Sequence, residues 1–276
     1  MLKFTKMQGC GNDYIYINCF EQKIEDPSAL SIELSRRGHS VGADGVILIC
    51  PSEVADAKMR MFNADGSEGK MCGNGVRCVG KFIYDNGIAT KDTVTVETLS
   101  GIKTLSVFAE NGKAYALTVD MGKASTDPAA LPVLSDAPVI DSPINIGGKE
   151  YRATCVSMGN PHCVVFCDDV KGLDLKTVGV PFERSELFPE SVNTEFVKVL
   201  GKNLLEMRVW ERGSGETLAC GTGACAVAVA ATLCGYCEKG EDITVRLLGG
   251  DLTINYTDER VLMTGPAVTV YEGIID

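Results

Sequence analysis

A short turn with the pattern Cys-Gly-x-Gly occurs twice in this chain, and an apolar helical pattern follows each copy. The two copies are Met71-Cys72-Gly73-Asn74-Gly75 and Ala219-Cys220-Gly221-Thr222-Gly223. Their cysteines are separated by about 150 positions, which is roughly the length of one domain. The duplication therefore predicts two similar halves, each with one helix N-terminus, in a chain whose 276 residues suffice for two domains.

The hydrophobic pattern of the rest of the chain predicts a mixed α+β fold in which strands outnumber helices. Short β-branched or alternating runs are typical of strands, and they lie at 15–17, 46–49, 59–62, 93–96, 115–119, 163–166, 196–199 and 252–256. Helices are expected after Asp26-Pro27, over 76–85 and over 224–233. The Pro-, Asp- and Ser-rich stretch 125–143 is typical of a connecting segment, and it puts the domain boundary near 118–125.

Charge and composition exclude several classes of function. The chain has 26 Lys and Arg against 37 Asp and Glu, so its net charge of -11 repels nucleic acid and an acidic membrane surface. The N-terminal residues lack the continuous apolar core of a secretory signal, and the longest weakly polar run, 221–235, is too short to cross a bilayer. We therefore expect a cytoplasmic protein without nucleic-acid or membrane partners, in which the cysteines are reduced.

The residue types in the repeated turn point to acid–base chemistry at carbon. A thiol just before a helix lies where unpaired backbone N–H groups and the positive end of the helix dipole meet, an environment that stabilises a thiolate. The flanking glycines let the backbone approach a ligand, and the N–H groups of residues 73, 74, 221 and 222 can hold a carboxylate. If two such sites face each other, one thiolate removes a proton from a carbon and the opposite thiol returns one to the other face. The pair therefore predicts racemisation or epimerisation without a cofactor.

Over nearly its whole length the sequence resembles the diaminopimelate epimerase family. Besides the two Cys-Gly turns, the matching blocks are Gly11-Asn12-Asp13-Tyr14, Gly42-Ala43-Asp44-Gly45, Phe62-Asn63-Ala64-Asp65-Gly66-Ser67, Gly159-Asn160-Pro161-His162, Asn193 and Glu211-Arg212-Gly213-x-Gly215-Glu216-Thr217. The resemblance implies two pseudo-symmetric α/β domains, each a barrel-like β-rich sheet around a central helix, with the active site in the cleft between them. It also implies that the C-terminal strand returns to the first domain, which gives domains of 1–118 with 264–276 and of 119–263.

The family's activity is the epimerisation of LL-2,6-diaminopimelate to the meso form, in lysine and peptidoglycan precursor synthesis, with neither metal nor pyridoxal phosphate. The resemblance implies that Cys72 and Cys220 are the acid/base pair, and that His162 and Glu211 tune the thiol pKa values, one near each cysteine. It places the substrate contacts on Asn12, Asn63, Gly73, Asn74, Asn160, Asn193, Glu211, Arg212, Gly221 and Thr222. Since only one end of such a substrate inverts, the distal end needs fixed polar contacts, which the Arg212 fork and the Asn amides can supply.

Two further positions stand out within the resemblance. Some members of the family carry Gln at the position of Gly45 as a ligand contact, and glycine has no side chain to make that contact. Tyr271, in the C-terminal segment, matches a position that the family uses in dimerisation. The resemblance therefore implies a homodimer.

Two other functions fit part of the pattern. A racemase or epimerase of the proline racemase type would share the thiol pair, but proline lacks the distant charged end that Arg212 with Asn160 and Asn193 would bind. A thiol redox or metal-binding protein would use Cys72 and Cys220 as a regulated disulfide or as ligands. Activity that depends on an oxidant or a metal would distinguish the redox or metal-binding protein from the epimerase.

Overall fold

The computed structural model describes residues 1–276 and divides into two compact units. Unit 1 comprises Met1–Asp120 together with Thr264–Asp276, and unit 2 comprises Met121–Met263. The chain therefore passes from unit 1 into unit 2 and returns once, so that the last strand belongs to the first unit.

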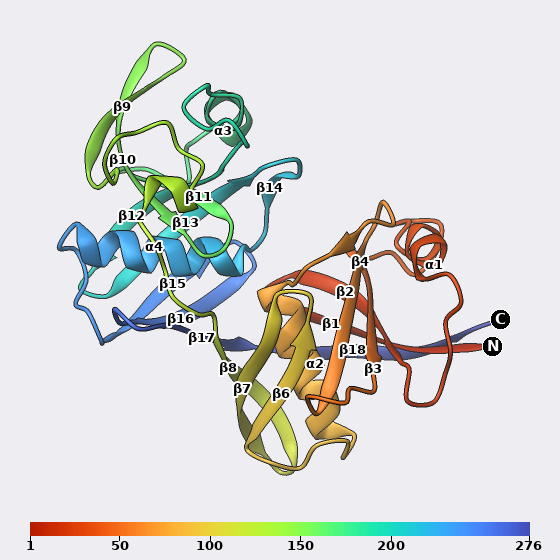
Figure 1. The fold of residues 1–276 in the computed structure, drawn as a ribbon. Helices are drawn as coiled ribbons and strands as arrows, with labels where there is room; N and C mark the ends of the chain where they lie inside the picture. Colours follow the sequence, from red (N-terminus) through yellow and green to blue (C-terminus); the bar gives the residue numbers. More distant parts are fainter. The chain divides into compact units, whose positions relative to one another are not determined.

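Unit 1 is a sheet that wraps around one helix, α2 (Gly73–Asp85). In order of pairing, its strands are β18 (Val268–Ile275), β1 (Leu2–Gly9), β2 (Asn12–Asn18), β3 (Gly45–Cys50), β4 (Ala57–Asn63), β6 (Thr93–Thr98), β7 (Gly101–Glu110) and β8 (Lys113–Asp120). The short β5 (Glu68–Gly69) pairs with β4, and α1 (Pro27–Leu34) packs against β3 and β4. In Figure 1, α2 lies among these strands and α1 lies at the margin of the unit.

Unit 2 is built in the same way around α4 (Gly221–Leu233). In order of pairing, its strands are β9 (Ser142–Ile146), β10 (Lys149–Ser157), β11 (Pro161–Phe166), β12 (Asn193–Gly201), β13 (Leu204–Glu211), β15 (Asp242–Leu247) and β16 (Gly250–Tyr256). The short β14 (Gly215–Thr217) pairs with β13, and β17 (Val261–Pro266) carries the chain back to unit 1. A single 3-10 turn, η1 (Pro128–Ala130), lies in the segment before β9, and α3 (Leu175–Glu183) packs against β12, β13 and β14.

The two units repeat one topology. In unit 1 the pairings β1–β2, β2–β3, β3–β4, β4–β6 and β6–β7 alternate between antiparallel and parallel. In unit 2 the pairings β10–β11, β11–β12, β12–β13, β13–β15 and β15–β16 alternate in the same order. The central helix has the same place in both units. It follows the short strand, β5 or β14, and precedes the strand that pairs in parallel, β6 with β4 or β15 with β13. This repeat confirms the predicted mixed α/β fold with two pseudo-symmetric halves.

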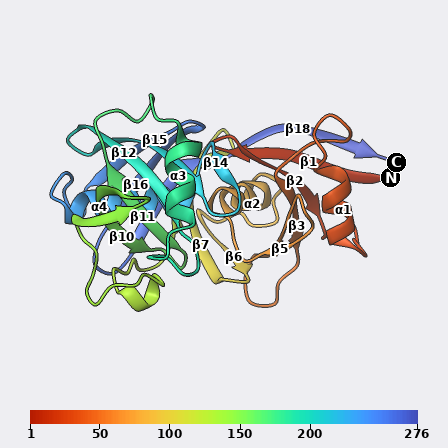
Figure 2. The same cartoon turned by 90° about the horizontal axis from the view of Figure 1, so that it is seen from above.

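Both central helices are buried on nearly every side, which fixes the position of their first turns. In α2 every residue from Gly73 to Ile83 is buried, and in α4 burial extends from Gly223 to Ala231. Helix α4 is small or apolar on nearly every side, and α2 buries Asn74, Arg77 and Lys81 beside its apolar residues, so both helices need other elements to enclose them. The strands around α2 supply this enclosure in unit 1, as the view from above also shows (Figure 2).

The strands predicted from the sequence lie within β2, β3, β4, β6, β8, β11, β12 and β16, and the three predicted helices are α1, α2 and α4. The start of α2 was expected at Val76 and that of α4 at Ala224, but both helices begin one turn earlier, directly after the cysteine. Helix α3 was not predicted, because Pro181 inside it opposes a helical assignment. The corrected starts matter, since they make Cys72 and Cys220 the N-cap residues.

Candidate active site

The thiols of Cys72 and Cys220 cap the two central helices in the same way. Cys72 has an extended backbone (φ -129°, ψ 124°), and its Sγ accepts a hydrogen bond from the Gly75 amide at 3.4 Å. Cys220 is also extended (φ -120°, ψ 111°), and its Sγ accepts from the Gly223 amide at 3.4 Å. A side chain at the N-cap normally holds the amide of the third helical residue, a role that Ser, Thr, Asp or Asn usually fills. Cysteine at this place puts a sulfur at the positive end of each helix.

The first amides of each helix form a second element of the site. Gly73 and Asn74 open α2, and Gly221 and Thr222 open α4. The first N–H groups of a helix have no acceptor within that helix, so they remain available to an anion. Each thiol therefore lies beside backbone donors that suit a carboxylate.

The second glycine of each turn is closely packed. A Cβ at Gly75 would lie 2.7 Å from the Cδ1 atom of Ile47, whereas a Cβ at Gly223 would lie 2.6 Å from Glu195 Oε1 and 3.3 Å from Cys220 Sγ. Both contacts are too short for a real side chain. A Cβ at Gly75 would crowd the core of unit 1, whereas a Cβ at Gly223 would crowd the polar groups beside Cys220.

Asn12 holds the thiol of Cys72 from a strand. The Cys72 thiol donates to Asn12 Oδ1 at 3.1 Å, and Asn12 lies at the start of β2. The strand starts there because a two-residue hairpin loop, Cys10-Gly11, precedes it, with φ angles of 52° and 78°. Positive φ at both loop positions is the geometry that matches the twist of paired strands, and glycine adopts it without strain.

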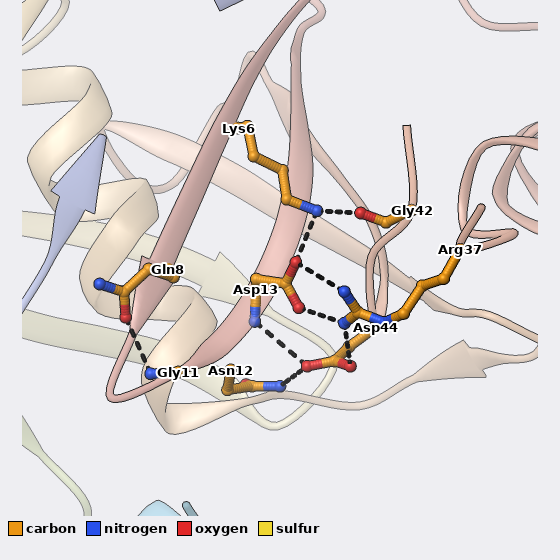
Figure 3. A network of polar contacts seen from close by, with 8 residues as sticks. All are labelled: Lys6, Gln8, Gly11, Asn12, Asp13, Arg37, Gly42 and Asp44. Carbon is orange, nitrogen blue, oxygen red and sulfur yellow. Dashed lines mark hydrogen bonds and ion pairs between the residues drawn. The ribbon is translucent and has the colours of Figure 1, made fainter. Parts of the chain in front are cut away.

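A network of charged groups orients the Asn12 amide (Figure 3). Its Nδ2 donates to Asp44 Oδ2 at 2.7 Å, so its oxygen is the atom that meets Cys72. Asp44 in turn accepts from Arg37 at 3.0 Å, and Arg37 and Lys6 both pair with Asp13. Burial alone would raise the pKa of Asp13, but these two cations hold the pKa below its usual range. The network therefore stays charged at neutral pH and keeps the amide in one orientation.

Two other predicted contacts of unit 1 lie nearby. Asn74 is buried, and its Oδ1 accepts at 2.9 Å from Arg77, a guanidinium with no exposed surface. Asn63, at the end of β4, donates to Ser67 Oγ at 2.9 Å. At Gly45, a Cβ would lie 2.1 Å from the backbone oxygen of Phe62, so no side chain fits at this position and the glutamine contact is absent.

Cys220 is more deeply buried than Cys72 and has carboxylates around it. Burial raises the pKa of its thiol well above the usual value, and the negative charges of Glu211 and Glu195 raise it further. The donors Thr222 and Gly223 lower the pKa but do not compensate. The Gly223 amide at the helix start lowers the pKa of Cys220, but burial and the like charges outweigh it, so the surroundings of Cys220 favour the thiol over the thiolate.

Glu211 lies at the end of β13, within hydrogen-bond reach of Cys220. Burial raises the pKa of its carboxyl group, while hydrogen bonds from Thr217 and Cys220 work in the opposite direction. Burial therefore opposes a negative charge on both the Cys220 thiol and the Glu211 carboxyl group.

A buried chain of hydrogen bonds connects the start of α4 with β11 and β12. Asn160 Nδ2 donates to Thr222 Oγ1 at 3.3 Å, and its Oδ1 lies 3.1 Å from His162 Nε2. The other ring nitrogen, Nδ1, lies 2.7 Å from Glu195 Oε1, and neither side chain of this pair is exposed. Because an amide oxygen only accepts, this arrangement places a proton on Nε2. Hydrogen bonds therefore connect His162 to the start of α4 through Asn160.

Asn193 and Arg212 form the outer part of the site in unit 2. Asn193 is buried at the start of β12, and its Oδ1 accepts from the Arg212 backbone amide at 3.0 Å. The Arg212 side chain is exposed, and it donates to the backbone oxygen of Glu190 at 3.0 Å. The exposed guanidinium is a suitable partner for an incoming carboxylate.

The structure thus brings the predicted residues together in two groups. The first group, in unit 1, joins Asn12, Cys72, Gly73 and Asn74, and the second, in unit 2, joins Asn160, His162, Asn193, Glu211, Arg212, Cys220, Gly221 and Thr222. Both pKa-modulating candidates, His162 and Glu211, belong to the unit of Cys220. Tyr271 lies on the exposed side of β18, with its ring edge-on to Phe4.

Sequence reasoning missed three groups that orient these residues: the half-exposed Asp44 and the buried Arg77 and Glu195. Asp44 belongs to a matching block and could have been found there, whereas Glu195 at the start of a strand gave no such signal. No group of three or more His, Cys, Asp or Glu side chains is placed to hold a metal ion. None of the helices is long and apolar enough to span a membrane.

Solved structures share this fold at low sequence identity. A probable proline racemase from Agrobacterium radiobacter superposes with a TM-score of 0.69 at 14% identity, covering 100% of this chain and 93% of the other. A hydroxyproline epimerase from Agrobacterium vitis also gives 0.69, at 15% identity, with 99% and 90% covered. The fold is therefore the one found in these racemases and epimerases.

Sequence comparison identifies the family within that class. The family model for diaminopimelate epimerase matches residues 4–126 and 154–270. The chain is 54% identical over 278 residues to the diaminopimelate epimerase of Methanococcus maripaludis, with 100% of both chains covered. It is 52% identical over 278 residues to that of Acetivibrio thermocellus, with 100% and 99% covered. This chain belongs to the diaminopimelate epimerase family, and it is an isomerase.

Proposed function

We propose that this enzyme interconverts LL- and meso-2,6-diaminopimelate, with Cys72 and Cys220 as its two bases. The observation that carries the proposal is the repeat: two thiols cap equivalent helices in two units of one topology. Each thiol lies beside backbone N–H groups that have no acceptor within their helix. A single such thiol would fit many nucleophilic enzymes. A matched pair fits a reaction that needs one proton removed and one added.

In the proposed reaction one sulfur starts as a thiolate and the other as a thiol. The thiolate takes the α-proton, and the electron pair of the broken C–H bond moves onto the adjoining carboxylate, where helix amides stabilise the charge. The pair then returns to carbon as the opposite thiol donates its proton to the other face. The carbon is inverted, the two sulfurs have exchanged roles, and no proton or electron is lost overall.

The raised pKa of Cys220 supports the acid role for this residue in the first half of a cycle. The remaining substrate contacts form two sets, one for each end of the substrate. The amides of Gly73, Asn74, Gly221 and Thr222 suit the reacting carboxylate, whereas Arg212 suits the distant one. Asn12, Asn63, Asn160 and Asn193 supply polar contacts that hold the substrate in one orientation.

The same proposal includes the setting of the enzyme. Its product, the meso isomer, serves lysine and peptidoglycan precursor synthesis in the cytoplasm, and the enzyme acts as a homodimer. Exposed apolar side chains on β18, namely Val268, Val270, Tyr271 and Ile274, support a subunit contact there. Sedimentation of the wild type against Tyr271→Ala tests this part, because loss of the contact shifts the protein toward a monomer.

The decisive experiment is solvent exchange in deuterated water. We expect the reduced enzyme, incubated with LL-diaminopimelate in the presence of a chelator, to place deuterium at one α-carbon and to produce the meso isomer. A parallel incubation with proline should show no deuterium. Exchange into proline but not into diaminopimelate would instead assign the proline racemase type of activity, and dependence on added metal or oxidant would overturn the two-thiol proposal.

A further inference from the structure

A histidine and a carboxyl group are buried together beside the first turn of α4. His162 lies on β11 and Glu195 on β12, and neither side chain has any exposed surface. The parallel register pairs His162 with Asn193, and Glu195 lies two residues after Asn193, so both side chains project from the same face. His162 Nδ1 lies 2.7 Å from Glu195 Oε1. Glycine at position 223 leaves the space that this oxygen occupies.

The second carboxyl oxygen of Glu195 limits the charge that this pair can carry. Glu195 Oε2 is buried, and no protein group donates a hydrogen bond to it. A carboxylate with an unpaired oxygen in such a place is costly unless a nearby positive charge compensates it. A neutral imidazole that donates from Nδ1 to a carboxylate would leave one full negative charge buried here. The unpaired oxygen therefore favours a pair without net charge.

The neighbouring titratable groups do not supply the compensating charge. Glu211 from β13, Cys220 at the cap of α4 and Cys163 on β11 lie around Glu195, whose negative charge raises the pKa of each. All three are acids, so they are neutral or negative. Compensation by His162 gives two forms without net charge, an imidazolium beside a carboxylate and a neutral imidazole beside a carboxylic acid. In both forms one proton lies between Nδ1 and Oε1, and Nε2 carries another.

The proton on Nε2 sets the direction of the Asn160 amide. His162 Nε2 lies 3.1 Å from Asn160 Oδ1, and Asn160 Nδ2 donates to Thr222 Oγ1 at 3.3 Å. Without its proton, Nε2 would accept a hydrogen bond, and the amide would have to turn over to place Nδ2 against the ring. The amide oxygen would then face the first turn of α4. Protonation of one buried nitrogen therefore decides whether that turn meets a donor or an acceptor.

We propose that His162 and Glu195 are held as a pair without net charge, which keeps Nε2 a donor and turns the Nδ2 group of Asn160 toward the start of α4. There the second N–H of Nδ2 lies with the backbone N–H groups of Gly221 and Thr222, so the carboxylate at the reacting carbon meets donors. The inference rests on the proposed function, and it adds Glu195 as a positioning residue that acts through His162.

The first experiment reads the protons of His162 directly. The chain has two histidines, and the other, His39, is exposed, so enzyme labelled with ¹⁵N-histidine carries its own control. In a long-range ¹H–¹⁵N spectrum at pH 7.5 without substrate, we expect His162 Nε2 to be protonated. Its proton should exchange slowly with water, whereas the ring protons of His39 exchange fast. A protonated Nδ1 with a bare Nε2 on His162 would overturn the proposal, whatever the substrate.

Two substitutions of similar size separate the carboxyl chemistry of Glu195 from its packing. In Glu195→Gln the amide can donate to Nδ1 without adding charge, so Nε2 should keep its proton and kcat/KM should stay within about twofold of the wild type. Glu195→Leu leaves Nδ1 without this partner, so we expect both tautomers of His162 and a kcat/KM lower by about tenfold, as for a hydrogen bond to a charged group. Thermal melts monitor folding, and equal kcat/KM in both folded variants would contradict the role of Glu195.

A third substitution tests the Asn160 donor and does not depend on the folding of the Leu variant. Asn160→Asp still accepts from Nε2 but places an oxygen where Nδ2 lay, so kcat/KM should fall by at least about a hundredfold while the His162 signals persist. A loss of less than about threefold would show that the amide oxygen faces the ligand, which contradicts the proposal. A protonated Nε2 in an enzyme that never exchanges the α-proton of diaminopimelate would instead refute the proposed function and leave the buried pair as described.

Discussion

Cys72 and Cys220 occupy equivalent places in two units of one topology, yet their surroundings differ in charge. Cys72 is half-buried, and its thiol donates a hydrogen bond to a neutral amide oxygen, that of Asn12. Cys220 is buried beside two carboxyl groups, Glu211 and Glu195, which raise its pKa. Duplication therefore preserved the cap and the helix amides but not the groups around the sulfur. Such an asymmetry suits a pair in which one member must hold a proton while the other lacks one.

The largest effect is expected from removing either sulfur. Cys72→Ala and Cys220→Ala should each lower epimerisation in both directions by at least about a thousandfold, because one general acid–base group accounts for roughly that factor. Chiral separation of the two isomers over time gives the rates. The control is Cys234→Ala, at the end of α4, which should keep normal turnover. Retention of activity by both Ala variants of the capping residues would contradict the two-base mechanism.

A smaller effect should follow from removing one charge beside Cys220. The Glu211 carboxylate raises the pKa of this thiol, so Glu211→Gln should lower that pKa and increase the thiolate fraction at pH 8. A decrease of one pKa unit corresponds to about tenfold faster alkylation at a pH below the pKa. Peptide mass spectrometry after a short pulse of iodoacetamide measures Cys220, and Cys72 in the same sample is the internal control. Equal acceleration of both cysteines would mean that the substitution loosened the fold.

The smallest difference concerns the second glycine of each turn. Gly223→Ala forces a Cβ against Glu195 and Cys220, whereas Gly75→Ala forces one against Ile47, whose methyl group can shift. Each change should lower stability by about 1–3 kcal/mol through overpacking, partly offset by the helix preference of alanine. We expect Gly223→Ala to lose severalfold more activity than Gly75→Ala at a similar loss in Tm. Thermal melts give the two Tm values, and turnover measurements give the two losses of activity. A larger loss of activity in Gly75→Ala than in Gly223→Ala would contradict this expectation.

The sequence predicted the cores of both units well, because their signals are local. A Cys-Gly-x-Gly turn followed by an apolar run and a glycine-containing stop predicts a helix, so α2 and α4 follow from the pattern, although both start one turn earlier than the run indicates. The thiols and the helix amides were likewise predicted from residue types. The family resemblance then supplied Asn12, Asn160 and Arg212.

The residues that escaped prediction depend on non-local pairing. Glu195 precedes the apolar run of β12 and looks like a solvated strand residue, until the parallel pairing of β11 with β12 brings it to His162. The raised pKa of Cys220 was missed for the same reason, since it depends on burial and on carboxylates far away in the sequence. Helix α3 was missed because its internal Pro181 opposes the local preference.

The pairing of β1 with β18 has a consequence for biosynthesis. A ribosome delivers the chain from the N-terminus, and it releases β18 only after every residue of unit 2 has been made. The continuous unit 2 can therefore reach its native pairing while unit 1, although translated earlier, still waits with the outer side of β1 uncovered. Nascent chains stalled before Val268 should thus be cleaved by protease in unit 1 while unit 2 resists, so translation order and folding order run in opposite directions.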